Sequence, residues 1–331
     1  MAIFVCVGVR NLKIQLLKKF DLLIGGLLVF CFSPPVKVAG GSLRSILFIR
    51  PGGIGDAVHL AYSLKALKGI SSSVKIDILA EKRNSGIFSL VSEVDRVFNY
   101  DNPKDLLTVL RHQYDVVIDT EQSHRLSAIV ARLIRSPVKI GYGTNERRRL
   151  FTHVVDYSHD EYEIESFLNL LTALGIDPPF SVQYPYLTIP QNAVEKVSSL
   201  LKDFIARPLI CFFPGASIVE RQWPVIKFRQ LAELFYECGL EVVVVGGRGD
   251  ELLGEQICTE RGLNLVGKTS LAETAAILAA SKLLVSGDSG VLHMAVSLDV
   301  PTVSLFGPGI EKKWAPQQEK NIVISHHLSC S

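Results

Sequence analysis

Short apolar runs rich in valine, isoleucine and leucine alternate with helical patterns along the chain from residue 45 onward. These runs predict strands at 45–49, 75–79, 115–119, 139–142, 209–213, 241–245, 264–266, 283–286, 302–305 and 321–325. Strands that lack polar alternation are buried on both faces, which is typical of parallel sheets covered by helices. We therefore expect an α/β protein whose ligands bind beyond the carboxyl ends of its strands.

A proline-containing stretch at residues 177–190 interrupts this alternation. A chain of 331 residues is long enough for two ordinary domains. We expect one Rossmann-like domain at 45–185 and a second at 186–331, with the ligand cleft between them. Residues 1–44 form a leader of different composition.

The leader combines a basic start with a short apolar run at residues 22–32, which Pro34 and Pro35 end. Its basic residues are Arg10, Lys13, Lys18 and Lys19. The run is short for a spanning helix, which needs about 20 apolar residues. A cleaved signal peptide, an interfacial helix on an anionic membrane face and a disordered leader remain open. Lys37, near the possible cleavage site, favours the interfacial helix on the inner membrane.

Charge and cysteine content argue against two other classes of protein. The formal net charge of +2 is too small to indicate nucleic-acid binding. The six cysteines form no CxxC pair or Cys/His cluster, so neither a metal site nor a disulfide framework is expected.

A glycine-rich turn follows the first expected strand and ends in Asp56. Gly52, Gly53 and Gly55 let the backbone turn tightly and approach a ligand closely. Asp56 then lies at a helix start, where it could act chemically or only cap the helix. A dinucleotide fingerprint with Asp77 as the ribose ligand is a further alternative, although Val58 stands where that pattern requires glycine.

Three turns in the second half of the chain have the features of anion sites. Residues 214–221 place Ser217 and Arg221 just past a strand, and residues 286–293 join a strand to a helix through small residues. Residues 245–251 contain Asp250, which could bind ribose hydroxyls or cap a helix. The first of these turns could also be a solvated loop with Trp223 as a packing anchor.

The order of these pieces resembles glycosyltransferase family nine, the ADP-heptose:lipopolysaccharide heptosyltransferases. The resemblance spans residues 45–325 and rests on ILFIRPGGIGD (46–56), DTEQSHRLS (119–127), IGY (140–142), FPGASIVERQWP (213–224), GKTSL (267–271), SGDSGVLH (286–293) and LFGP (305–308). It implies a GT-B architecture, with the acceptor on the N-terminal domain and the nucleotide sugar on the C-terminal domain. Family members usually continue into a further helix that packs back onto the first domain, whereas this sequence ends at Ser331.

The resemblance also implies roles for individual residues. Asp56 matches the proposed general base, and Arg221 matches a donor-phosphate contact that is lysine in many relatives, a change that keeps the charge but alters the geometry. The predicted donor site consists of Ala216, Ser217, Arg221, Asp250, Thr269, Asp288, Ser289, Gly290 and His293. Ala216 lacks the hydroxyl that some relatives offer there.

The predicted acceptor site consists of Gly53, Gly55, His124, Arg125, Arg147 and Arg148. The arginines suit a phosphate-rich acceptor, although the run 147–149 could equally be a solvated loop. The implied reaction is inverting transfer of a heptose or related sugar from an ADP-sugar to a lipopolysaccharide core or similar envelope acceptor. It needs no metal or cofactor and takes place in the cytoplasm, on the inner membrane surface.

Three other functions remain open on the sequence. They are a NAD-dependent oxidoreductase, a non-catalytic nucleotide-sugar-binding relative, and a nucleotide-sugar epimerase of the same architecture. The first gives no role to the turn at 286–293, the second predicts donor binding without turnover, and the third needs no acceptor.

Overall fold

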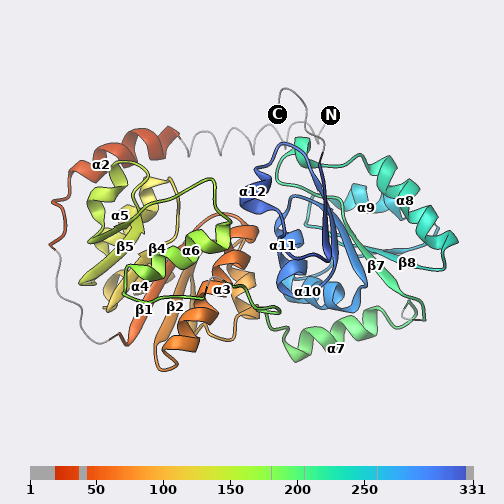
Figure 1. Cartoon of the computed structure of the whole chain (residues 1–331), viewed down its shortest axis with the longest axis horizontal. Helices are drawn as coiled ribbons and strands as arrows, with labels where there is room; N and C mark the ends of the chain where they lie inside the picture. The colour runs from red at the N-terminus through yellow and green to blue at the C-terminus, as the bar shows by residue number, and fades with distance from the viewer. Residues whose placement is uncertain (1–18, 37–42, 180, 205, 259, 326–331) are drawn as a thin grey trace.

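The computed structural model describes residues 19–36, 43–179, 181–204, 206–258 and 260–325. They form two six-stranded sheets, each with helices on its faces (Figure 1). The first sheet contains β1 (Ser45–Arg50), β2 (Lys75–Ala80), β3 (Arg96–Asn99), β4 (Val116–Asp119), β5 (Val138–Tyr142) and β6 (His153–Val155). The second contains β7 (Leu209–Phe213), β8 (Glu241–Val244), β9 (Leu263–Asn264), β10 (Leu283–Gly287), β11 (Thr302–Phe306) and β12 (Asn321–Ser325).

All the strand pairs in both sheets are parallel. The strand orders are β3-β2-β1-β4-β5-β6 and β12-β11-β10-β7-β8-β9, which is the same Rossmann-type topology twice. The order reverses between β1 and β4 in the first sheet and between β7 and β10 in the second. Ligands of such sheets bind at these switch points, so the two positions identify the candidate site.

Helices and short 3-10 turns fill the connections. In the first domain they are α3 (Ile54–Ile70), η2 (Ser85–Leu90), α4 (Pro103–Arg111), α5 (Arg125–Leu133), η3 (Glu146–Leu150) and α6 (Glu163–Thr172). In the second they are α7 (Gln191–Leu200), η4 (Val219–Arg221), α8 (Val225–Glu237), α9 (Glu251–Ile257), α10 (Leu271–Ala280), α11 (Gly290–Ser297) and α12 (Glu311–Trp314). Helix α10 begins directly after Ser270, because Ser270 and Glu273 form a capping box.

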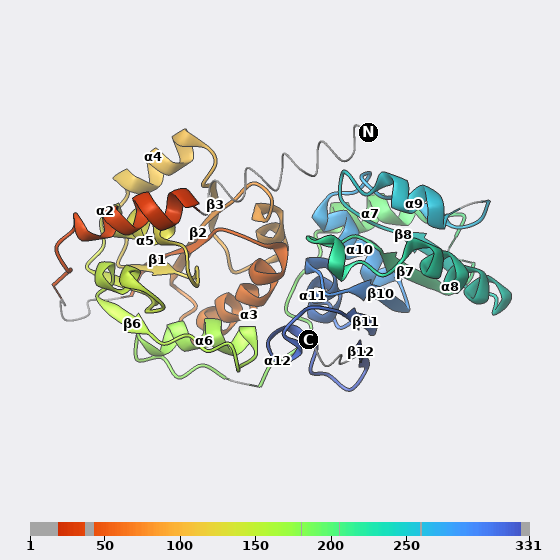
Figure 2. The ribbon, with the colours of Figure 1, turned by 90° about the horizontal axis from the view of Figure 1, so that it is seen from above.

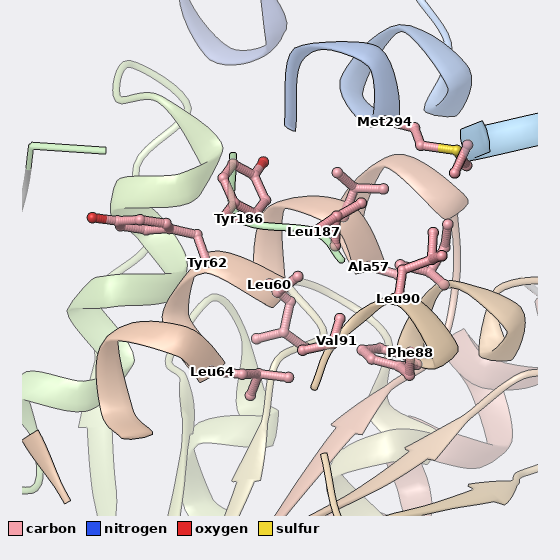
Figure 3. Packing of buried hydrophobic residues seen from close by; sticks show 14 of the residues in the cluster. Ala57, Leu60, Tyr62, Leu64, Phe88, Leu90, Val91, Tyr186, Leu187 and Met294 are labelled. Carbon is pink, nitrogen blue, oxygen red and sulfur yellow. The ribbon is translucent and has the colours of Figure 1, made fainter. Parts of the chain in front are cut away.

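One cluster of buried apolar residues spans both domains. Helix α3 is buried on most of its length, since it packs on its own sheet and also against α11 of the second domain. Figure 3 shows Leu60 of α3 close to Tyr186 and Leu187, which belong to the segment between α6 and α7. Met294 of α11 lies above them. Burial of this surface stabilises the arrangement of the two domains.

The leader packs on the first domain. Its described part contains η1 (Asp21–Gly25) and α2 (Gly26–Phe30), which lie beside α5 and η3 (Figure 2). The carboxylate of Asp21 accepts the backbone N–H groups of Arg125 and Leu126 at 2.8 and 2.9 Å, so it caps α5 from a distant part of the chain. No described helix is long and apolar enough to span a bilayer. Arg10, Lys13 and Lys18 lie outside the described residues.

Most of the expected strands are confirmed, with ends that differ by one or two residues. The structure adds two strands that the sequence did not predict, β3 and β6, both short strands at the start or the end of the sheet order. The strand expected at 264–266 is present only as β9 at Leu263–Asn264. The change from one sheet to the other falls between α6 and α7, the stretch that contains the predicted boundary at 185/186.

Candidate active site

Asp56 lies in the first turn of α3, directly beyond the carboxyl end of β1. Gly52 has a φ of 104°, a backbone conformation that favours glycine. The Asp56 carboxylate turns back over Gly53, where a Cβ would lie 2.8 Å from Oδ2. The glycines therefore allow the turn to hold a carboxylate at the switch point of the first sheet.

Gln122, which follows β4 on the other side of that switch point, approaches Asp56. Its Nε2 lies 3.4 Å from Asp56 Oδ1 and 2.6 Å from Oε1 of Glu163, the first residue of α6. The buried Arg50 lies behind them and is paired with Glu121 at 3.1 Å. Burial lowers the pKa of Arg50, but Asp56, Glu121 and other carboxylates raise it more, so Arg50 stays cationic.

The turns at the two switch points meet across the domain interface. A Cβ on Gly55 would lie 2.8 Å from Cδ2 of His293, and a Cβ on Gly290 would lie 2.7 Å from Cβ of Ile54. Only glycine permits so close an approach of the starts of α3 and α11. The structure thus brings the predicted base next to the predicted donor turn.

Arg221, Asp288 and His293 form one polar cluster in the second domain. Arg221 Nη1 lies 3.0 Å from Asp288 Oδ2, and His293 Nε2 lies 3.9 Å from Asp288 Oδ1. Gly287 lets η4 come close, because a Cβ there would lie 2.7 Å from the carbonyl oxygen of Arg221. Burial lowers the pKa of His293 against the opposing effect of the Asp288 and Asp56 carboxylates, which favours a neutral imidazole.

The start of α11 is a capped helix terminus. Ser289 is the N-cap residue, and its hydroxyl accepts the N–H of Leu292 at 3.2 Å. The cap leaves the first N–H groups of the helix, including that of Gly290, at the switch point of the second sheet. Ser217 is exposed in the turn after β7, and Ala216 is half-buried beside it.

A cavity of about 300 Å³ lies beyond β8 and β9 and is lined by Gly246, Gly247, Arg248, Gly267, Lys268, Thr269 and Ser270. Thr269 is the one predicted donor residue among them. Asp250 supports the cavity wall instead, since its Oδ2 accepts the N–H of Gly247 at 3.2 Å.

The structure separates the predicted acceptor residues into two groups. His124 and Arg148 are exposed. Arg147 is fully buried, with its guanidinium against the carboxylate of Asp119, so it is not placed to contact an acceptor. Arg125 Nε donates to Glu146 Oε1 at 2.7 Å, and its Nη1 lies 3.6 Å from the carboxylate of Asp21 in the leader. Both arginines were predicted as acceptor ligands, and their burial and ion pairs argue against that role.

Asp77 is not available as a ribose ligand. It lies within β2, only 3% exposed, and its carboxylate accepts hydrogen bonds from Arg96 and from the hydroxyl of Tyr114. The first glycine-rich turn therefore lacks the acidic partner that a dinucleotide fingerprint requires.

Several residues of the site were not predicted. Gln122 lies inside the motif at 119–127 but was not assigned a role. Glu163 and His59 belong to no motif that pointed to the site. His59 is buried next to His293, with 4.3 Å between ring centroids, and neither of its ring nitrogens has a hydrogen-bond partner within the described chain.

The described residues contain no cluster of metal-ligating side chains.

Comparison with known proteins identifies the family of this chain. The family model described as glycosyltransferase family 9 (heptosyltransferase) matches residues 105–331. Lipooligosaccharide heptosyltransferase 2 of Haemophilus influenzae is 27% identical over 309 residues, which cover 85% of this chain and 88% of that protein.

Solved structures show the same fold. A glycosyl transferase family 9 protein from Veillonella parvula matches with a TM-score of 0.79 and 21% identity, covering 88% of this chain and 90% of that one. The ADP-heptose lipopolysaccharide heptosyltransferase II of E. coli matches with a TM-score of 0.75 and 25% identity, covering 85% and 90%. Because the family model spans more than half of the sequence, the chain belongs to glycosyltransferase family 9.

Proposed function

We propose that this chain transfers a heptose from ADP-heptose to the core of lipopolysaccharide or a closely related envelope acceptor. Family membership and the heptosyltransferase relatives support the donor and the acceptor class. The observation that carries the proposal is the meeting of the Asp56 turn with the start of α11. A carboxylate from one domain there lies beside a helix N-terminus of the other, and helix N-termini favour bound anions.

In the proposed reaction, Asp56 removes the proton of the acceptor hydroxyl as that oxygen attacks the anomeric carbon of the heptose. The bond to the ADP oxygen breaks on the opposite face, so the configuration at the anomeric carbon inverts. Arg221 and the N–H groups at the start of α11 stabilise the charge that develops on ADP. These groups supply the electrostatic stabilisation without a metal ion.

The remaining donor contacts follow from the second sheet. The cavity at Arg248, Lys268 and Thr269 takes the nucleoside, and Ser217 contacts the phosphates from the turn after β7. On the acceptor side, His124 and Arg148 are exposed and offer hydrogen-bond donors to a phosphorylated core.

Arg221→Ala is expected to weaken ADP binding roughly 10- to 100-fold, because a charge-assisted hydrogen bond contributes about 1.5–3 kcal/mol. Nε of Arg221 is buried and has no hydrogen-bond partner within the described chain, so the guanidinium retains capacity for a phosphate. Calorimetric titration with ADP, UDP and GDP measures the effect. Arg229→Ala, an exposed arginine on α8, is the matched control.

Tight ADP binding that is unaffected by Arg221→Ala would remove Arg221 from the donor site. Preference for UDP or GDP would retain glycosyl transfer and change the donor. Binding without any transfer would favour a non-catalytic relative.

We also propose that the chain works at the cytoplasmic face of the inner membrane, held there by its leader. Leu23, Leu27 and Phe30 of the leader helix are 60–70% exposed, although Val29 on the opposite side is buried against the domain. Arg149 lies over the Phe30 ring at 4.9 Å, which adds positive charge beside this apolar face. An apolar strip flanked by basic residues suits an anionic lipid surface.

Replacing Leu23 and Leu27 together with glutamate is expected to lower binding to phosphatidylglycerol vesicles by at least about 10-fold, because both side chains would otherwise be buried in lipid. Vesicle co-sedimentation measures this binding. Leu234→Glu with Leu252→Glu changes two leucines of the second domain that are 57% and 52% exposed, and serves as the control. Equal sedimentation of the two double variants would contradict a membrane role for the leader.

A further inference from the structure

Lys313 of the second domain inserts its side chain into the first domain. It belongs to the short helix α12, which lies between the domains in Figure 1, and its side chain is only 1% exposed. Its ammonium lies 2.9 Å from Glu163 Oε2 and donates to Ser166 Oγ at 2.9 Å and the Ser158 carbonyl at 2.6 Å. It also lies 4.2 Å from the centre of the Tyr157 ring. All of these partners belong to the first domain.

Glu163 is fully buried and uses both of its oxygens. Oε1 accepts from Gln122 at 2.6 Å, and Oε2 accepts from the Tyr157 hydroxyl at 3.0 Å as well as from Lys313. Burial and the neighbouring Asp56 carboxylate raise the pKa of Glu163, while Lys313 lowers it. The net effect raises the pKa of Glu163, and Lys313 is the cation that opposes this shift and favours the carboxylate as a hydrogen-bond acceptor.

The same carboxylate fixes the amide of Gln122. An ionised carboxylate only accepts hydrogen bonds, so Glu163 requires the NH₂ group of Gln122 on its side. That NH₂ group is also the one that faces Asp56, with Nε2 3.4 Å from Oδ1. A protonated Glu163 could donate instead, and Gln122 could then turn its oxygen toward Asp56 and repel it.

We propose that Lys313 is a positioning residue that couples closure of the donor domain to the orientation of Asp56, acting through Glu163 and Gln122. The proposal rests on the proposed transfer reaction, in which Asp56 is the base. When the domains close, Lys313 enters the pocket at Tyr157, Ser158 and Ser166 and pairs with the Glu163 carboxylate. Gln122 then holds Oδ1 of Asp56, and Oδ2 is left for the acceptor hydroxyl. Asp56 is thereby oriented for proton removal only when the donor domain has closed on the first domain. This coupling limits wasteful hydrolysis of the donor.

The neighbouring Lys312 provides a matched control. It lies on the same helix and pairs with Asp160 of the first domain at 3.6 Å, but its side chain is 67% exposed. Lys312→Met and Lys313→Met therefore remove the same charge from the same interface. Only Lys313 contacts Glu163, through which the proposed coupling to Asp56 acts.

Lys313→Met is expected to lower kcat about 10- to 100-fold with the Kd for ADP unchanged, because a misplaced base costs rate rather than donor affinity. Lys312→Met is expected to have the kcat and the Kd for ADP of the wild type. Introduced into Asp56→Asn, Lys313→Met should change the residual rate less than about twofold, since two residues that act through one step are not additive. A purely structural loss would lower the rate of Asp56→Asn as well.

Removal of Lys313 alone leaves a buried carboxyl without its partner, so the double variant Lys313→Met with Glu163→Gln keeps the test valid if the single variant fails to fold. This variant leaves no unpaired charge and is expected to fold and remain at least about 10-fold slow. A kcat equal to that of the wild type in either variant would overturn the proposal, as would additive effects with Asp56→Asn.

Small-angle X-ray scattering with bound ADP provides a readout that does not depend on transfer. Lys313→Met is expected to show a larger radius of gyration than Lys312→Met, because only Lys313→Met removes the buried interdomain ion pair. Identical scattering profiles would refute the coupling even if the wild type transfers heptose. A wild type that transfers no heptose would instead refute the proposed function, while the scattering would still decide whether Lys313 holds the domains together.

Discussion

Asp56→Asn is expected to lower turnover by about 10²–10⁴-fold, the usual contribution of a well-placed general base. Asparagine has nearly the same shape and also fits the first turn of α3, so the fold and the glycine-rich turn should persist. ADP binding should be unchanged, because the donor contacts come from the second domain. The loss should therefore appear in kcat and leave the Kd for ADP unaltered.

Steady-state transfer and ADP titration on the same preparation measure both quantities. Asp156→Asn, an exposed aspartate of the same domain, controls for loss of a negative charge. Near-normal turnover in Asp56→Asn would rule out Asp56 as the base. A matching loss of ADP affinity would show that the substitution has disturbed the domain interface instead.

Arg147→Met is expected to lower the free energy of unfolding by about 3–5 kcal/mol, because it leaves the buried Asp119 carboxylate without its cation. Both side chains are fully buried. Burial raises the pKa of Asp119, and Arg147 opposes that shift. Arg147 also donates to the Glu121 carbonyl and lies 5.4 Å from the centre of the Phe151 ring, so the site depends on it for packing as well as charge.

Chemical denaturation measures this change, and Arg148→Met provides the comparison. Arg148 is exposed, so its substitution should alter stability by less than about 0.5 kcal/mol and act instead on the KM for the acceptor. Wild-type stability in Arg147→Met together with a raised acceptor KM would restore Arg147 to the acceptor site.

The arginine run at 147–149 shows why sequence alone misplaced one acceptor residue. Three consecutive basic residues suggested an exposed loop, but the segment folds as η3, capped by Asn145. That short helix turns the first arginine inward to Asp119 and the next two outward. The partner lies 28 residues earlier, beyond the reach of local patterns.

The central strands were predictable because burial on both faces leaves continuous apolar runs, as in Ile46–Ile49 and Leu209–Phe213. The edge strand Arg96–Asn99 is partly exposed and carries Arg96 and Asn99, so it has no such run. The other unpredicted strand, His153–Val155, has only three residues. The turns that carry Asp56 and Asp288 were predictable because they need small residues at fixed offsets from a strand.

The contact between Lys313 and Glu163 across the domains could not be predicted from the sequence. Lys313 stands in a four-residue helix, 147 residues from Ser166 and 155 from Ser158. Glu163 opens α6 like an ordinary acidic residue of a first helical turn. Only the folded arrangement shows that these two charges meet in a buried pocket.

Mass spectrometry of the acceptor is the most direct test of the proposed heptosyl transfer. The purified chain is incubated with ADP-heptose, a heptose-deficient lipopolysaccharide core and EDTA. We expect the core to gain heptose, ADP to be released in equal amount, and both changes to be lost in Asp56→Asn. Binding of ADP-heptose with no change in the mass of the core would contradict the proposed transfer.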